Sequence, residues 1–286
     1  MASMRDIKRR RSSIQGTQQI TKAMKLVSTV KLQRARSNAE RTKTYFDTMY
    51  RTVGSILSRV GTIDHRYLTP GECTRKAVVV ITSNRGLAGG YNSNVVRQLT
   101  AMEDWDKSEI DIYAIGNKGG EYLDRHGYTV KESLPEVIEA PTYKDASSLA
   151  DRLLESFGKG EIGEIYLAYT FFKNTVSHEP RLIKLLPVEI SEEDLEESSS
   201  QALMNFEPKD EEAIDLIIPK YISSLIYGAM MEAVASENGA RMQAMDNATS
   251  NAEEMIDHLT LMYNRARQGS ITQELTEIIA GAEAIG

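Results

Sequence analysis

Two glycine-rich turns are the first places in this sequence where residue type and spacing could support chemistry. Gly86–Gly90 (GLAGG) follows the β-branched run Lys76–Thr82, and Gly116–Gly120 (GNKGG) follows Ile110–Ile115. A strand, a glycine turn and a helix is the arrangement by which dinucleotide-binding domains hold phosphate. Neither turn matches GxGxxG or GxxxxGK[ST]. We therefore interpret the glycines as residues that tight strand-to-helix turns require, and keep an α/β nucleotide-binding enzyme as an open alternative.

The remaining reactive residue types do not form a recognisable constellation. The four histidines are far apart in the sequence, without the spacing of metal ligands, at His65, His126, His178 and His258. Cys73 is the single cysteine, which excludes an internal disulfide and fits a reducing compartment. No GxSxG motif is present. The sequence thus predicts no catalytic residue, no metal and no cofactor.

A polar band near the C-terminus suits recognition of another protein better than catalysis. It runs over residues 264–275 (NRARQGSITQEL), where Arg267, Gln268 and Thr272 are expected on one side of a helix. Arg and Gln offer directed hydrogen-bond donors that fit carboxylates and carbonyls of a partner. The plainer interpretation is an ordinary solvated helix face.

Charge is distributed unevenly along the chain. Net charge is −7, yet residues 1–60 hold 14 Lys and Arg against three acids, and residues 209–286 hold five bases against 13 acids. Opposite charge favours pairing of the two ends, and the positive surplus points to an acidic partner. A basic helix also fits a coiled-coil nucleic-acid-binding protein, so that alternative stays open.

Composition is that of an ordinary water-soluble chain. Its 286 residues are 41% hydrophobic and 26% charged. We find no run of 18 apolar residues, and therefore expect no membrane span. We expect no secretory signal either, because the N-terminal residues contain no apolar core region.

Both ends of the chain read as very long helices. At about 1.5 Å per residue, a helix over residues 1–60 reaches roughly 90 Å, whereas a domain of about 120 residues has a radius of gyration of about 14 Å. The helices should therefore extend beyond the domain and pair with each other. A 3-4-3-4-3 spacing predicts the seam of the first helix, at Met4, Ile7, Arg11, Ile14, Gln18 and Thr21.

The middle of the chain, residues 75–190, alternates between strand and helix patterns. Strands are expected at 76–82, 110–115, 128–131, 164–172 and 181–188, with helices near 94–102, up to 125, and at 143–157. The predicted fold class is α/β: a long antiparallel coiled coil of N- and C-terminal helices (1–60 and 209–286) plus a Rossmann-like α/β globular domain.

The second long helix carries several interruptions. We expect Pro219 to kink or restart it, and Gly228, Gly239 and Gly269 to mark close backbone approaches. Its last turns carry a narrow apolar stripe of Ile271, Leu275, Ile278 and Ile279. Before this helix, the acidic segment 191–200 is expected to be an exposed loop.

Four stretches give the chain a resemblance to a known family. They are 20–27 (ITKAMKLV), 86–92 (GLAGGYN), 236–245 (SENGARMQAM) and, most specific, 263–275 (YNRARQGSITQEL) leading into 276–279. They resemble the gamma subunits of bacterial F-type ATP synthases, the rotating central shafts, and the likeness covers essentially the whole chain.

That resemblance implies a non-catalytic subunit at the cytoplasmic face of a bacterial membrane. Its coiled coil would enter the hexamer of alpha and beta subunits, and its globular domain would meet the epsilon subunit and the proton-driven c-ring. Nucleotides would bind to the alpha and beta subunits, and neither nucleic acid nor a direct membrane span is implied.

Partner-contact residues are carried over on the same basis. Arg267, Gln268 and Thr272 match positions that contact catch loops of beta, and Met24 and Lys25 match a stretch facing its acidic lever loops. The shaft tip, 271–285, would turn in an apolar bearing and includes Ile271, Leu275 and Ile278. The cysteine pair of chloroplast relatives is missing, so their thiol regulation is not expected. Unlike mitochondrial precursors, which carry a cleavable leader, the chain is expected to begin almost directly at the helix.

Overall fold

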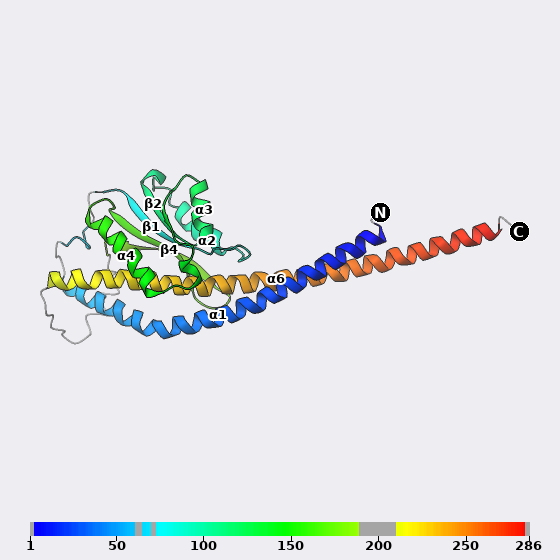
Figure 1. Ribbon diagram of the computed structural model, residues 1–286, viewed down its shortest axis with the longest axis horizontal. Coiled ribbons are helices and arrows are strands. Elements are labelled where there is room, and N and C mark those ends of the chain that lie inside the picture. Colours follow the sequence, from blue (N-terminus) through cyan, green and yellow to red (C-terminus); the bar gives the residue numbers. More distant parts are fainter. Residues whose placement is uncertain (1–2, 61–64, 70–72, 189–209, 284–286) are drawn as a thin grey trace. The chain divides into compact units, whose positions relative to one another are not determined.

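The computed structural model describes residues 3–60, 65–69, 73–188 and 210–283 (Figure 1). Two helices are far longer than the others: α1 (Met4–Val60) and α6 (Asp210–Glu283). The chain divides into two compact units. One combines residues 1–28 with 242–286, and the other is residues 29–241. Each long helix therefore contributes to both units.

The larger unit contains a five-stranded sheet in the order β3-β2-β1-β4-β5. Its strands are β1 (Lys76–Ile81), β2 (Ile110–Ile115), β3 (Thr129–Ser133), β4 (Glu164–Phe172) and β5 (His178–Leu186). Neighbouring strands from β3 to β4 are parallel, while β5 pairs antiparallel with β4 through a hairpin. Parallel neighbours require crossover helices, which explains the alternating pattern in the sequence.

Three shorter helices and two 3₁₀ turns connect the strands. The helices are α2 (Tyr91–Thr100), α3 (Asn117–Arg125) and α4 (Tyr143–Gly158), and the turns are η1 (Lys107–Glu109) and η2 (Val137–Glu139). Helix α4 begins with a capping box, in which Thr142 and Asp145 each accept a hydrogen bond from the other's backbone N–H. The expected strands and helices are all present, with ends shifted by a few residues.

Two apolar clusters hold the sheet between its helices. Val78 and Val80 of β1 pack with residues of α2 and α3 on one face. On the other face, Val79 and Ile81 pack with α4 and with α6. The continuous apolar run of β1 follows from burial on both sides, because β1 is the central strand.

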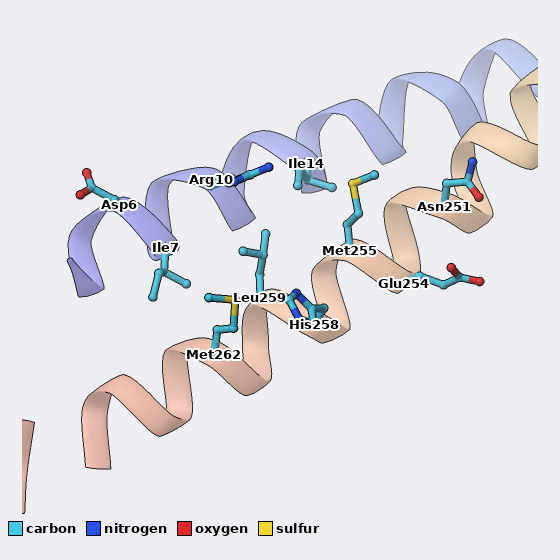
Figure 2. Close-up of a pocket in the computed structure, with 10 residues that line it drawn as sticks. All are labelled: Asp6, Ile7, Arg10, Ile14, Asn251, Glu254, Met255, His258, Leu259 and Met262. Atoms are coloured by element: carbon cyan, nitrogen blue, oxygen red, sulfur yellow. The ribbon is translucent and has the colours of Figure 1, made fainter. Parts of the chain in front are cut away.

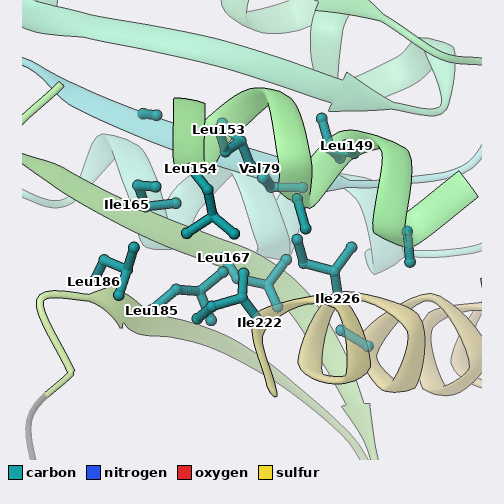
Figure 3. Packing of buried hydrophobic residues seen from close by; sticks show 14 of the residues in the cluster. Val79, Leu149, Leu153, Leu154, Ile165, Leu167, Leu185, Leu186, Ile222 and Ile226 are labelled. Atoms are coloured by element: carbon teal, nitrogen blue, oxygen red, sulfur yellow. The ribbon is translucent and has the colours of Figure 1, made fainter. Parts of the chain in front are cut away.

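The first half of α6 is a core helix of the larger unit. Four isoleucines recur every fourth residue and are fully buried: Ile214, Ile218, Ile222 and Ile226. Figure 3 shows Ile222 and Ile226 beside Leu167 and Leu185 of the sheet. Pro219 lies within α6 without ending it.

The two compact units divide α1 near residue 28 and α6 near residue 241. The assignment of residues 1–60 and 209–286 to coiled-coil helices stays a prediction. The acidic segment 191–200 lies outside the described residues.

One described helix meets a length-and-composition test for crossing a membrane, namely α6 over Ile214–Ala282. Half of its most apolar 18-residue window is buried inside the protein. The core helix of a soluble protein passes the same test, so this result is weak evidence of a span.

Candidate partner-binding surface

The backbone amides that a nucleotide phosphate would need at the second glycine turn are already bonded within the chain. At the start of α3, the N–H groups of Asn117, Lys118 and Gly119 donate to Asn84 Oδ1, Ser83 O and Thr82 Oγ1, at 3.1, 3.0 and 2.8 Å. A phosphate site at a helix N-terminus needs these donors free. The residues that follow β1 thus take up the amides that a phosphate at the start of α3 would need.

The first glycine turn is fastened internally and to α6. Ser83 Oγ donates to Arg85 O at 2.6 Å, and the Asn92 amide donates to Ser83 Oγ at 2.8 Å. Tyr91 donates its hydroxyl to Ala233 O of α6 at 3.2 Å. Burial raises the pKa of Tyr91 well above its ordinary value, so this side chain stays neutral. The residue that follows this turn therefore links it to α6.

The described residues contain no group of three or more His, Cys, Asp or Glu side chains that could hold a metal ion. In the smaller unit, α1 residues up to 28 pair with α6 residues from 242.

The middle of this helix pair is held largely by polar contacts. Thr21 and Thr249 share a hydrogen bond of 2.8 Å, Gln18 donates to Glu253 at 3.0 Å, and Lys25 pairs with Asp246 at 2.6 Å. Exposed pairs of this kind contribute about 0–1 kcal/mol each. The predicted seam residues are all buried or half-buried, which confirms the 3-4 spacing, but the seam is weak because few of them are large and apolar.

An apolar groove opens between the helices nearer the N-terminus of α1. Its volume is about 490 Å³. Figure 2 shows Ile7 and Ile14 of α1 facing Met255, Leu259 and Met262 of α6 across it. Asp6, Arg10, Glu254 and His258 also line this groove. The α6 side of this groove, Met255, Leu259 and Met262, was not predicted from the sequence, although its i, i+4, i+7 spacing is typical of an apolar helix face.

Past the groove, α6 presents a bare apolar stripe. The exposed fractions of Ile271, Leu275, Ile278 and Ile279 are 49%, 55%, 68% and 59%. Large aliphatic side chains at such exposure on one face mark an interaction site. On α1, Ile20, Leu26 and Val27 are exposed in the same way.

The predicted contact residues of α6 lie on this bare part of the helix. Arg267, Gln268 and Thr272 are exposed, and Thr272 donates to Gln268 O at 2.9 Å. At about 100° per residue, Arg267, Gln268 and Thr272 fall with the four residues of the apolar stripe within an arc of about 140° around the helix axis. We call this arc the contact arc. One side of α6 therefore combines directed polar groups with apolar anchors, which is the composition of a protein interface.

The predicted contact residues of α1 are less free. Met24 is half-buried, and Lys25 is half-buried with its ammonium group on Asp246. A partner would have to compete with Asp246 for the charge of Lys25.

Together these features define a class of protein: an α/β domain built around a helix that continues into a two-helix coil, with exposed apolar side chains near the C-terminal end of that helix. Comparison with known proteins gives the family. The ATP synthase family pattern matches residues 3–285. The chain is 62% identical over 293 residues to the ATP synthase gamma chain of Lachnoclostridium phytofermentans, with 100% of both chains covered. It belongs to the ATP synthase gamma chain family.

Two further comparisons place it within that family. It is 38% identical to the "ATP synthase gamma chain, sodium ion specific" of Acetobacterium woodii, covering 99% of both chains. A chain in the central stalk and c-ring structure of Tetrahymena thermophila mitochondrial ATP synthase matches with a TM-score of 0.60 and 25% identity. That match covers 80% of this chain and 99% of the other. These matches do not favour the nucleic-acid-binding alternative.

Proposed function

We propose that this chain is the rotary central-stalk subunit of an F-type ATP synthase and is itself non-catalytic. The observation that carries the proposal is the full-length family match. The exposed apolar and polar side of α6 over residues 267–279 supports it, because a shaft needs a surface for the subunits around it.

In this proposal, the partners are the alpha and beta subunits, the epsilon subunit and the c-ring. The coil would lie inside the alpha–beta hexamer at the cytoplasmic face of the bacterial membrane. A ligand shifts a conformational equilibrium only through its different affinity for the two states. Here the asymmetric coil acts as that ligand. Its rotation changes which beta subunit meets Arg267, Gln268 and the apolar stripe, and so drives product release at one site after another.

The decisive experiment compares changes on two different sides of α6. In the reconstituted complex in vesicles, we expect Gln268→Ala combined with Arg267→Gln to lower both gradient-driven ATP synthesis and ATP-driven ion pumping. Gln273→Ala is the matched control, because Gln273 is exposed and lies about 170° from the centre of the contact arc. Equal effects of the two changes would contradict the assignment of the contact face.

Truncation tests the apolar stripe separately. Removing residues from Ile271 onward should reduce coupling further, because the stripe supplies the apolar anchors at the end of the shaft. If coupling survives both the truncation and the Arg267 and Gln268 changes, the assigned contact roles are wrong.

The coupling ion needs its own measurement, since one relative is named as sodium ion specific. We propose protons. ATP synthesis that stops with a protonophore and is not restored by a sodium gradient would support this choice, and restoration by sodium would overturn it.

A further inference from the structure

The β4–β5 hairpin approaches α6 closely at Gly239. A Cβ atom placed on Gly239 would lie 2.7 Å from Cε1 and 3.1 Å from Nε2 of His178. Real Cβ atoms essentially never approach other atoms under 3.0 Å, so the imidazole fits only because this position has no side chain. Gly239 is buried and lies inside α6, which continues through it without a break.

The hairpin places the imidazole in this position. His178 is paired with Phe172 across the two strands, and their rings lie 5.9 Å apart. Asn174 Oδ1 accepts from the backbone N–H groups of Val176 and Ser177, at 2.9 and 2.8 Å, which fixes the turn. A second attachment lies one turn earlier on α6, where Ser236 donates to Thr170 O at 3.2 Å.

Both ring nitrogens of His178 are buried, and neither has a hydrogen-bond partner among the described residues. Burial lowers the pKa of His178 below its ordinary value. Most charged groups on the hairpin and on the adjoining turns of α6 form ion pairs with one another. Glu179 accepts from Lys173 and Arg181, and Glu237 pairs with Arg241. Burial raises the pKa of Tyr169, and Glu232, two turns before Gly239, adds to that shift.

We infer that the His178 ring, seated against Gly239, fastens the β4–β5 hairpin to α6, and that acidification loosens this fastening. The neutral imidazole packs as an apolar ring. His178 is half-buried, but both of its ring nitrogens are out of contact with solvent. A protonated imidazole would place a charge and two N–H donors where neither nitrogen has an acceptor among the described residues, which disfavours the charged form.

The direction of the pH effect follows from linkage. Because the folded state binds the proton less readily than the unfolded state, the contribution of His178 is fully present above its unfolded pKa of about 6.5 and is lost as pH falls below it. This fastening is a property of the free chain and does not depend on the proposed rotary role.

A double-mutant cycle tests the steric half of the inference. In the full chain, Gly239→Ala should raise the unfolding equilibrium constant at least fivefold because the methyl group meets the ring. In a His178→Ala background the same change should lower that constant about fivefold, because Ala exceeds Gly in helix propensity by about 1 kcal/mol. The matched control is Gly269→Ala on the same helix. Nothing lies within 4 Å of its Cβ position, so its effect should be equal in both backgrounds.

A pH series tests the other half. Between pH 8 and pH 5, the unfolding constant of wild type should rise about threefold or more relative to His178→Phe, which keeps a ring and cannot titrate. His178→Gln provides a second non-titrating variant if the Phe variant does not fold. Parallel pH profiles for wild type and a folded variant would overturn the pH dependence. An unchanged sign of the Gly239→Ala effect would overturn the contact itself.

Discussion

Helix α6 is both part of the core and part of the shaft, and one substitution separates these roles. Ile222 is fully buried and packs in the cluster that joins α6 to the sheet (Figure 3). Ile222→Ala removes three carbon atoms. At about 0.8 kcal/mol per buried CH₂, this loses about 2.4 kcal/mol. A residual cavity of roughly 40 Å³ adds about 1 kcal/mol, so we expect a loss of about 3–4 kcal/mol in the free energy of unfolding.

The matched control is Leu216→Ala. It removes the same number of carbon atoms from the same helix, six residues earlier, but Leu216 is 61% exposed. Its expected cost is about 0.5 kcal/mol or less. The assay is urea unfolding followed by fluorescence of Trp105, the single tryptophan of the chain. This residue packs against Tyr166 of the sheet with ring centroids 4.6 Å apart, so it reports on the larger unit.

The comparison requires that the slope of unfolding free energy against urea is unchanged, so that a shifted midpoint means changed stability. A midpoint for Ile222→Ala within error of that for Leu216→Ala would refute the placement of α6 in the core. It would also remove the physical basis for torque passing from the sheet domain into this helix.

Three further changes test other contacts by unfolding of the free chain. Gly116→Ala should cost more than about 3 kcal/mol, because Gly116 has φ of +89° and its Cβ would collide with the Thr82 carbonyl. Gly127→Ala, with φ of +85° and open space around it, should cost only the strain of about 1–2 kcal/mol; equal losses would contradict the collision. Burial, aided by Glu232, raises the pKa of Tyr169 to about 12. Its neutral form therefore stabilises the fold below pH 10, a contribution lost between pH 10 and 12, and Tyr169→Phe should flatten the stability profile there; an unaltered profile would be evidence against this. Tyr91→Phe removes the hydrogen bond to α6 and should cost about 1 kcal/mol; no loss would mean that this bond contributes nothing.

Much of the secondary structure could be predicted from the sequence because buried faces require apolar residues at the spacing of a helix or a strand. The β-branched run at 76–81 and the alternation of strand and helix located the sheet. The 3-4 spacing of Met4 to Thr21 identified the seam, and the family followed from short stretches such as 263–275. These signals are local, so they can be read without knowing what packs against them.

Periodicity identifies an apolar face but not the surface that covers it. The isoleucines of α6 could have faced α1 along their whole length, and only tertiary packing shows that four of them face the sheet. Of the glycines expected to mark close approaches, Gly239 does so against His178, whereas nothing lies near Gly269. The amides of the second glycine turn are likewise bonded to Thr82, Ser83 and Asn84, about 35 residues earlier. The sequence by itself determined the helices, the strands and the family, whereas contacts between distant residues decided which turns and glycines fasten α6, because such contacts depend on three-dimensional proximity that no local pattern encodes.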